Sequence, residues 1–365
     1  MTWKNASFFR RGLIGLALFG WVLIFGEGFV RLFAPVALMP RYVTGAPYGI
    51  RMNIPNASYW ETTQEVHVEV RTNSQGIRAD REYAIEKPPG VCRVLMQGDS
   101  FFMGYEVDLK NSIQALVEKG LNDTGYPCEV INLAVSGFGT AEELITLRAA
   151  GLRYQPDVLL LEMHSSDLDD NVRSGLFRLD ANGLKQTSQV YLPGIQISDK
   201  LMRIGLYRWL IENSQFYSYA RERIATTIKK MMLTSATAVP DENAPASRDN
   251  SVLDYERRLN LALVDEITKT LPPQSRLMML EIPDSPSRTK FTSAHPIEPG
   301  NVYEQRGQYI SILDELSAAA RPDLKLYYEK GHGHLTPVGT AIAADKTVKA
   351  LIKLPELQQY RQSAK

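Results

Sequence analysis

The feature that most constrains the fold is an alternation that begins at residue 91, where short β-rich apolar runs take turns with amphipathic helical runs. Such alternation is typical of βαβ units that build a parallel sheet. The apolar runs predict five strands, at residues 93–97, 129–133, 157–163, 276–282 and 324–328. The other runs predict helices at 111–122, 141–152, 255–271, 302–320 and 337–354. The predicted fold class is therefore α/β, a three-layer, doubly wound sheet of five parallel strands.

Composition agrees with a globular chain and excludes several other classes. Of the 365 residues, 44% are apolar, which supplies an ample core. The 41 Lys and Arg residues balance the 41 Asp and Glu residues, so bulk charge gives no reason to expect a nucleic-acid partner. Two cysteines are too few for a disulfide framework or a four-cysteine zinc site.

The alternation also divides the chain. We predict a cytoplasmic N-terminus and transmembrane anchor at 1–40 and a membrane-proximal lead-in at 41–90. The α/β domain, of the flavodoxin-like type, follows at 91–354, and its rhythm is broken by an insertion at 172–251. A polar tail occupies 355–365. The insertion either caps the ligand-binding edge of the sheet or packs on its flank.

The N-terminal segment has the pattern of a membrane anchor. Basic residues precede an uncharged apolar run at 12–26, and apolar character resumes after Glu27. The stretch is long enough to span a bilayer if Glu27 and Arg31, one helical turn apart, pair near its outer end. The basic residues favour a cytoplasmic N-terminus, so we expect a single pass through the cytoplasmic (inner) membrane with the remaining chain periplasmic. The alternative is a cleaved signal peptide, but no small-x-small cleavage site precedes Pro40.

That compartment permits a disulfide. Cys92 and Cys128 lie at the starts of two apolar runs. If these runs are adjacent parallel strands, the two side chains are within bridging distance. We therefore predict a Cys92–Cys128 bridge, with two small buried thiols as the alternative.

Ligands of such a sheet bind beyond the carboxyl ends of its strands, so the residues that follow each strand matter most. Ser100 follows the first strand behind Gly98, a position suited to a nucleophile, although Gly-Asp-Ser also makes a good turn and helix cap. Gly137 follows the second strand and offers an unhindered backbone N–H. His332 and His334, two of only five histidines, lie after the last predicted strand, and histidine is the usual base for activating a serine.

Three blocks, in this order and at these separations, resemble the SGNH (GDSL-type) hydrolase superfamily. They are Gly98-Asp99-Ser100, the Asn-Leu-Ala-Val-Ser-Gly-Phe-Gly-Thr stretch at 132–140, and His334-Leu-Thr-Pro-Val-Gly at 334–339. The resemblance spans roughly residues 73–354. The anchored lead-in, with Arg-Thr-Asn-Ser-Gln-Gly-Ile-Arg at 71–78, is similar to single-pass bacterial members associated with envelope polysaccharides or lipids.

The resemblance implies acyl transfer through a serine, without a cofactor. Ser100 would be the nucleophile and His334 the general base. The N–H groups of Ser100 and Gly137, with a block-three side chain at Ser166, would form the oxyanion hole. Water as acceptor gives an esterase that acts on an O-acyl group of an envelope carbohydrate or lipid. A sugar hydroxyl as acceptor gives an O-acyltransferase.

Two departures from the family pattern leave alternatives open. Block three usually reads Gly-Asn-Asp, and here Ser166 replaces the asparagine. No carboxylate stands just before His334, where related sequences carry an aspartate. Glu329 could lie behind His334, or Glu329 and His332 could form the acid–base pair. A Ser–His dyad oriented by a backbone carbonyl, or an inactive binding protein that kept the fold, are the other readings.

A zinc site is the remaining enzymatic rival. His332 and His334 with nearby carboxylates have suitable donor atoms, but the sequence offers no third ligand that can be placed. We therefore predict no metal.

Overall fold

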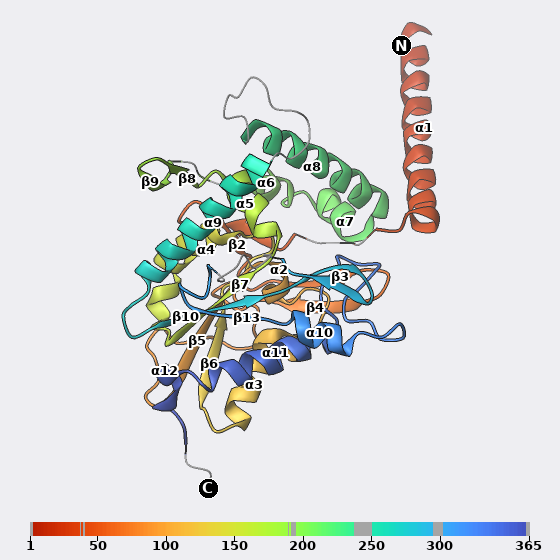
Figure 1. The fold of residues 1–365 in the computed structure, drawn as a ribbon. Coiled ribbons are helices and arrows are strands. Elements are labelled where there is room, and N and C mark those ends of the chain that lie inside the picture. The colour runs from red at the N-terminus through yellow and green to blue at the C-terminus, as the bar shows by residue number, and fades with distance from the viewer. Residues whose placement is uncertain are drawn as a thin grey trace.

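The computed structural model describes residues 3–36, 38, 41–188, 190, 195–236, 250–294 and 302–362. Its centre is a five-stranded parallel sheet in the order β13-β10-β7-β5-β6 (Figure 1). The strands are β5 (Cys92–Gln97), β6 (Cys128–Asn132), β7 (Val158–Met163), β10 (Arg276–Glu281) and β13 (Gln308–Ser311). The chain enters at β5, winds to β6, and then reverses through β7 to β13. The predicted doubly wound α/β fold is confirmed, with its switch point between β5 and β7.

Two hydrophobic cores cover the two faces of this sheet. Alternate residues of a strand face opposite layers, so Val94 belongs to one core and Leu95 to the other. The first core includes α3 (Ile113–Asp123) and α11 (Pro337–Leu351). The second includes α4 (Thr140–Ala149) and α9 (Asn250–Thr270). Because β5 and β7 are buried at every residue, their sequences are near-continuous apolar runs.

The fifth strand lies elsewhere than predicted. The segment expected to be a helix at 302–320 holds β13 and the shorter helix α10 (Leu313–Ala319). The segment expected to be a strand at 324–328 makes only isolated bridges, among them Tyr327 with Leu335. β13 is an edge strand whose residues are only partly buried, so it lacks the apolar run that identifies a central strand.

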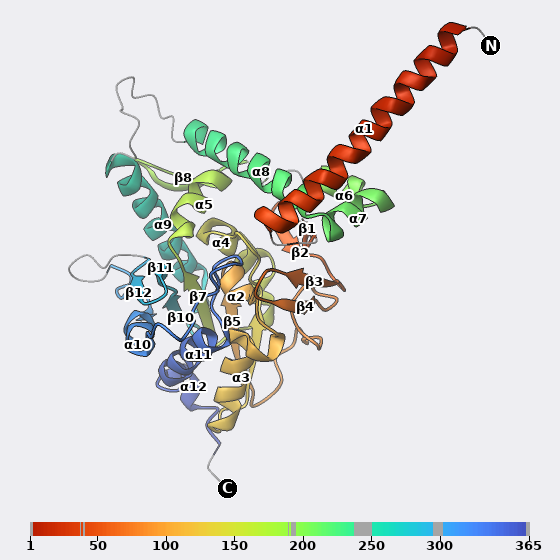
Figure 2. The ribbon, with the colours of Figure 1, turned by 90° about the vertical axis from the view of Figure 1, so that its right-hand side faces the viewer.

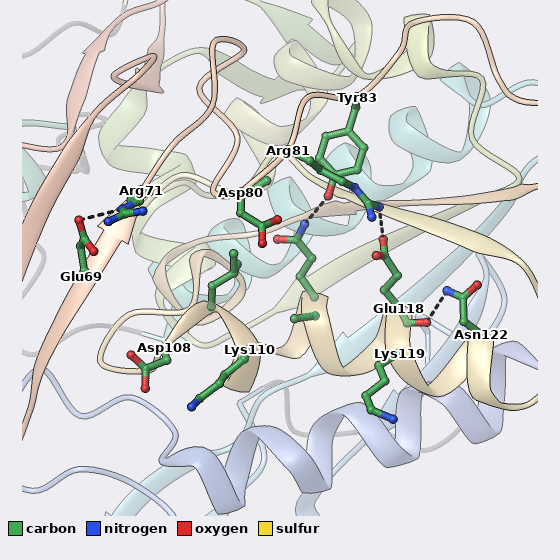
Figure 3. Close-up of a pocket in the computed structure, with 14 residues that line it drawn as sticks. Glu69, Arg71, Asp80, Arg81, Tyr83, Asp108, Lys110, Glu118, Lys119 and Asn122 are labelled. Atoms are coloured by element: carbon green, nitrogen blue, oxygen red, sulfur yellow. Dashed lines mark hydrogen bonds and ion pairs between the residues drawn. The ribbon is translucent and has the colours of Figure 1, made fainter.

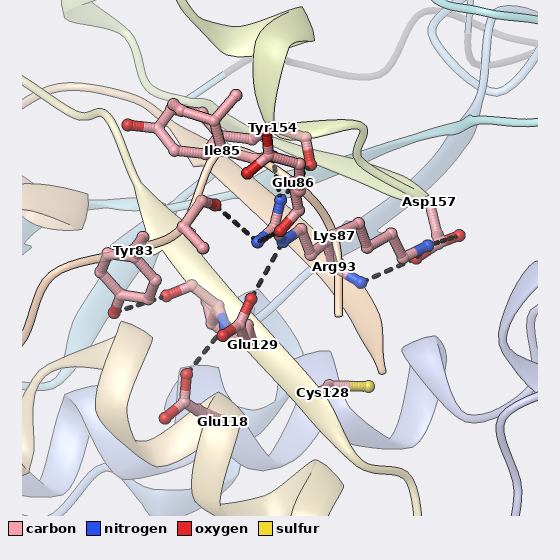
Figure 4. Close-up of polar contacts among 12 residues, drawn as sticks. Tyr83, Ile85, Glu86, Lys87, Arg93, Glu118, Cys128, Glu129, Tyr154 and Asp157 are labelled. Atoms are coloured by element: carbon pink, nitrogen blue, oxygen red, sulfur yellow. Dashed lines mark hydrogen bonds and ion pairs between the residues drawn. The ribbon is translucent and has the colours of Figure 1, made fainter. Parts of the chain in front are cut away.

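The last residues of the lead-in, 84–87, lie at the amino end of the sheet. The buried guanidinium of Arg93 donates to the carbonyl oxygens of Ala84, Ile85 and Glu86 in the lead-in, at 2.7 to 3.0 Å (Figure 4). It also pairs with Glu129 of β6 at 2.9 Å. At the same end, Cys92 and Cys128 are register partners with Cα atoms 4.4 Å apart and form the predicted disulfide.

The remaining elements are short or peripheral. The lead-in contains β1 (Val43–Gly45), β2 (Arg51–Asn53), β3 (Ser58–Thr62) and β4 (His67–Arg71). The 172–251 region contains the end of α5 (Ser166–Ser174), then β8 (Phe177–Asp180), β9 (Gly183–Gln186), α6 (Ile195–Leu201), α7 (Gly205–Asn213) and α8 (Gln215–Ala236). The others are α2 (Ser100–Met103), η1 (Leu109–Asn111), η2 (Gly151–Tyr154), β11 (Asp284–Ser287), β12 (Lys290–Thr292) and α12 (Pro355–Gln358).

The N-terminal helix α1 (Trp3–Phe33) projects away from the α/β domain in both views (Figures 1 and 2). Its segment Leu13–Phe33 is long and apolar enough to cross a membrane, a property that signal sequences share. Only the carboxyl end of α1 lies beside the body of the protein, next to α7 and α8.

Candidate active site

Ser100 is presented by a tight turn between β5 and α2. Asp99 caps α2 by accepting a hydrogen bond from the N–H of Phe101 at 2.8 Å. The buried carboxyl of Glu162, at the end of β7, accepts from the N–H groups of Asp99 and Phe102 at 3.0 and 3.1 Å. A Cβ at Gly98 would overlap Glu162 Oε2, so this approach of strand to turn requires glycine. Burial and the nearby Asp99 raise the pKa of Glu162 well above its usual value.

His334 joins Ser100 to a carboxylate. His334 Nε2 lies 2.8 Å from Ser100 Oγ, and His334 Nδ1 lies 3.0 Å from Glu106 Oε2. The imidazole is buried between the rings of Phe101 and Tyr105, which it meets edge-on. Glu106 also accepts hydrogen bonds from the backbone N–H groups of His332 and His334, at 3.0 and 3.2 Å. The three side chains form one serine–histidine–glutamate chain.

Glu106 reaches this place because its loop is held from both sides. The N–H of Glu106 donates to the buried Glu61 of β3 at 2.9 Å. The buried guanidinium of Arg78 donates to the carbonyl oxygens of Met103 and Gly104, and to that of Val107 at 2.6 Å. Residues of the lead-in therefore shape the site.

Gly331 lies directly against the carboxylate of Glu106. A Cβ there would overlap Glu106 Oε1, so only glycine lets the loop before His334 close over Glu106.

The environment keeps Glu106 ionised. Burial acts to raise its pKa, but the hydrogen bond and the charge of His334, with two backbone N–H donors, outweigh burial. The pKa of Glu106 therefore lies below its usual value. In contrast, burial and the neighbouring His334 lower the pKa of His332, which favours its neutral form.

The structure does not bring the predicted acid Glu329 to His334. Both carboxylate oxygens of Glu329 pair with Arg288, at 2.5 and 2.6 Å, on the surface. The ring of His332 lies 6.2 Å from that of His334, and no contact joins it to Ser100 in the described part of the chain. The sequence interpretation missed Glu106, and its signal was a single acid within the apolar and aromatic stretch that follows Ser100.

Two backbone donors lie in the turns that follow β5 and β6. Ser100 is the first residue of α2, where helix N–H groups have no partner within the helix. Gly137 has φ +73°, and Arg51 donates to its carbonyl oxygen, which fixes the peptide. Among the described residues, neither the N–H of Ser100 nor that of Gly137 donates to another protein group. Both are available to an oxyanion.

Ser166, at the start of α5, is held by a second histidine. Ser166 Oγ lies 2.9 Å from His164 Nδ1 and 3.4 Å from Asp99 Oδ2. His164 Nε2 lies 3.4 Å from Asp284 Oδ1. Burial acts to lower the pKa of His164, but the hydrogen bond to Asp284 and the charges of Asp99, Asp167 and Asp284 raise it overall.

Two cavities meet at Ser100 and His334. One, of about 620 Å³, lies between the lead-in and the α6–α8 region and is lined by Arg51, Tyr207 and Ile211. The other, of about 640 Å³, lies under the loops after β7 and β10, and His164, Ser166 and Asp284 line it.

A third cavity, of about 700 Å³, contains none of these residues. Charged side chains on its wall pair with each other, for example Arg81 with Glu118 at 2.7 Å (Figure 3).

The described residues contain no group of three or more His, Cys, Asp or Glu side chains arranged to hold a metal ion. Both ring nitrogens of His334 are engaged, by Ser100 and by Glu106.

No protein-family model and no curated protein matches the chain. Among solved structures, the lipase/acylhydrolase from Enterococcus faecalis matches at 14% identity and TM-score 0.33, over 75% of this chain and 100% of that one. The acetyl xylan esterase AlAXEase matches at 12% identity and TM-score 0.35, over 71% and 99%. TesA matches at 13% identity and TM-score 0.36, over 71% and 97%. The matches also include lipolytic proteins of the G-D-S-L family, the kind of hydrolase that the sequence blocks resemble.

Proposed function

We propose that the protein is a serine ester hydrolase of the SGNH type. The observation that carries the proposal is the continuous hydrogen-bonded chain from Ser100 Oγ through the His334 imidazole to Glu106. A serine activated by a histidine whose other nitrogen faces a buried carboxylate is the arrangement for nucleophilic acyl transfer. The contact of Glu106 with His334, in the role of the acid that the sequence pattern lacked, supports an active enzyme over an inactive binding protein.

In the first half of the reaction, Ser100 Oγ attacks the ester carbonyl carbon. Its proton passes to His334 Nε2, and Glu106 stabilises the imidazolium through Nδ1–H. The carbonyl oxygen becomes an oxyanion, which the N–H groups of Ser100 and Gly137 and the hydroxyl of Ser166 stabilise. His334 then gives its proton to the leaving alcohol, and an acyl-serine remains.

In the second half, an acceptor hydroxyl attacks the acyl carbon while His334 takes its proton. The bond from the acyl carbon to Ser100 Oγ then breaks, and His334 returns the proton to Ser100. Water as acceptor returns the acid and gives an esterase. The two cavities that meet at Ser100 support a second candidate, an O-acyltransferase to a polysaccharide, because they leave room for an acyl donor on one side and an alcohol on the other.

We further propose that α1 anchors the enzyme in the cytoplasmic membrane with its catalytic unit outside. The substrate would then be an O-acyl group of an envelope carbohydrate or lipid. The catalytic unit includes the lead-in, since Glu61 and Arg78 support the loop of Glu106. A reporter that is active only outside the cytoplasm, fused after Lys365, tests the orientation, and an inactive reporter contradicts it.

The test of the chemistry uses the full chain in detergent, a fluorophosphonate probe and a short-chain nitrophenyl ester. We expect the parent protein to be labelled and Ser100→Ala to lose labelling, with turnover reduced by about 10⁴-fold or more. Ser285→Ala, which changes another hydroxyl on the cavity wall, is the matched control and should keep both. A folded parent protein with neither labelling nor turnover contradicts the proposal.

A further inference from the structure

The carboxyl end of α1 is joined to the loop between α7 and α8 by a set of polar contacts. The carboxylate of Glu27 accepts hydrogen bonds from Ser214 Oγ at 2.7 Å and from the N–H groups of Gln215 and Phe216, both at 3.0 Å. These are the donors at the start of α8, so a side chain of α1 caps another helix. The contacts fix α7 and α8 relative to α1.

Two neighbouring contacts strengthen this joint. Arg31 Nη2 donates to the carbonyl oxygen of Asn213, the last residue of α7, at 2.8 Å. Gly26 lies against the ring of Phe216, where a Cβ would come within 2.9 Å of a ring carbon. The charged pair in the apolar helix, Glu27 and Arg31, thus serves the contact with α7 and α8.

Helices α6 and α7 and the residues between them carry large apolar side chains that face away from the protein. These are Ile197, Ile204, Leu206 and Trp209, with exposed fractions of 66%, 53%, 69% and 56%. We refer to them as the α6–α7 apolar patch. Exposed basic residues, Lys200, Arg203 and Arg208, lie among them in the sequence. Apolar residues with tryptophan and interspersed basic residues are the composition of segments that lie in a membrane interface.

The patch lies near the apolar carboxyl end of α1, to which α7 is joined by Arg31. Phe29, Leu32 and Phe33, at the carboxyl end of α1, are 59%, 76% and 72% exposed. The polar joint places α7 beside this end, as both views show (Figures 1 and 2). If α1 crosses a bilayer, its carboxyl end lies at the bilayer surface, and the patch lies at the same level.

The opposite side of α7 belongs to the active-site cavity. Tyr207 and Ile211, one turn apart, line the cavity that contains Ser100 and His334. Leu206 and Trp209 do not line it. One helix therefore separates the proposed membrane surface from the catalytic serine.

We propose that the α6–α7 apolar patch inserts into the headgroup region of the bilayer, and that the enzyme takes its acyl group from a lipid or lipid-linked ester in that membrane. This inference rests on the proposed esterase activity and on α1 as an anchor. Among the substrates compatible with the site, it selects amphiphilic esters over freely dissolved polysaccharide. A second copy of the chain, or a partner protein, on the patch is the alternative that the test must separate.

The test compares two substrates with the full chain reconstituted in anionic phospholipid vesicles. We expect Leu206→Ser combined with Trp209→Ser to leave turnover of a soluble short-chain ester unchanged. Turnover of a long-chain ester carried in the vesicles should fall by about tenfold, because two apolar contacts with the membrane are lost. Val190→Ser, which removes an exposed aliphatic group outside the patch and outside both active-site cavities, is the matched control and should change neither rate. An unchanged vesicle rate in the double variant overturns the proposal.

A second measurement does not depend on catalysis. With Cys92 and Cys128 bridged, Leu206→Cys gives a single thiol for an environment-sensitive fluorophore. We expect lipids with bromine near the headgroup to quench this fluorophore, and not one placed at Lys119→Cys, whose side chain is exposed on the outer side of α3. Failure of soluble-ester turnover with strong quenching would reject the proposed function while supporting the membrane contact. Absence of quenching, or crosslinking of the patch to a second copy, overturns the inference.

Discussion

The two ends of the central sheet use polar groups in opposite ways. At the amino end, polar groups are matched within the protein: Arg93 pairs with Glu129 and satisfies buried carbonyl oxygens, and Lys87 pairs with Asp157 at 2.5 Å (Figure 4). At the carboxyl end, the N–H groups of Ser100 and Gly137 donate to no other group in the described part of the chain, and Ser100 lines two cavities. The same strands thus carry a closed structural network at one end and an open set of donors at the other, which is where parallel sheets bind ligands.

The ends also differ in how charge is arranged. Opposite charges meet at the amino end, whereas four carboxyl groups crowd below the site at the carboxyl end. They are Asp99, Glu143, Glu162 and Asp167. Burial and mutual repulsion raise the pKa of Glu143 and of Glu162 well above the usual value. Carboxyl groups with perturbed pKa values beside a cleft are a feature of candidate functional sites, which agrees with the proposed assignment.

The largest effect on kcat is expected from a change of Glu106, the carboxylate at the carboxyl end of the sheet. Glu106→Gln keeps the shape of the side chain but removes the charge that stabilises the His334 imidazolium. We expect kcat for a short-chain ester to fall by about 10⁴-fold, as loss of the orienting acid does in serine hydrolases. Glu329→Gln is the matched control and should keep kcat within about twofold, because Glu329 pairs with Arg288 at the surface. Equal losses in the two variants would contradict the role of Glu106.

This contrast between two glutamates explains what the sequence could and could not predict about the site. Ser100, Gly137 and Ser166 lie between or at the ends of a strand and the next helix, and His334 lies just before α11. The order of the elements was therefore enough to place them near one edge. Glu106 lies on a loop that Arg78 holds through backbone carbonyl groups, and Glu106 itself has a left-handed backbone conformation with φ +64°. Such tertiary contacts leave no periodic pattern, so the acid was sought near His334 in the sequence.

Changes in the polar network at the amino end of the sheet should lower the stability of the protein and not its kcat. Arg93→Met removes the donor to four backbone carbonyl groups and leaves Glu129 without its partner. We expect the free energy of unfolding to fall by about 3 to 5 kcal/mol, measured by urea denaturation. Arg81→Met, which breaks the more exposed pair with Glu118, should cost less than about 1 kcal/mol. A large fall in kcat of folded Arg93→Met protein would break the distinction between the two ends.

The fold was predicted well where burial is complete and poorly at the edge. The central strands are near-continuous apolar runs, so they could be read directly. β13 is half-buried, and its sequence Gln-Tyr-Ile-Ser resembles part of a helical stretch. The apolar run near residue 326 instead supports the segment that carries His334, where the N–H of Tyr328 donates to the His334 carbonyl oxygen at 2.8 Å.

A smaller kinetic effect is expected at the oxyanion site. Ser166→Ala removes one of three proposed donors, and loss of one such donor lowers kcat by about 10²-fold or more. Ser165→Ala is the matched control, because the hydroxyl of Ser165 donates to Asp284 at 2.8 Å and has no proposed part in the reaction. We expect it to change kcat by less than about fivefold. If the two variants behave alike, the oxyanion hole has only backbone donors.

The smallest effect is expected in the pH dependence of kcat, which tests whether the hydroxyl of Ser166 donates to the oxyanion. When His164 is protonated, its Nδ1–H donates to Ser166 Oγ, which leaves the serine hydrogen for Asp99 Oδ2, 3.4 Å away, or for the oxyanion. When His164 is neutral with its hydrogen on Nε2 toward Asp284, Nδ1 accepts that serine hydrogen instead. Because the pKa of His164 is raised, the productive form persists to higher pH than for an ordinary histidine and is lost as pH rises through that pKa. We therefore expect kcat to decline by about three- to tenfold on the alkaline side, a hydrogen-bond-sized effect. His164→Gln, which cannot titrate, should be slower at neutral pH and lack this decline, whereas an unchanged alkaline limb would remove His164 from the proposed oxyanion site.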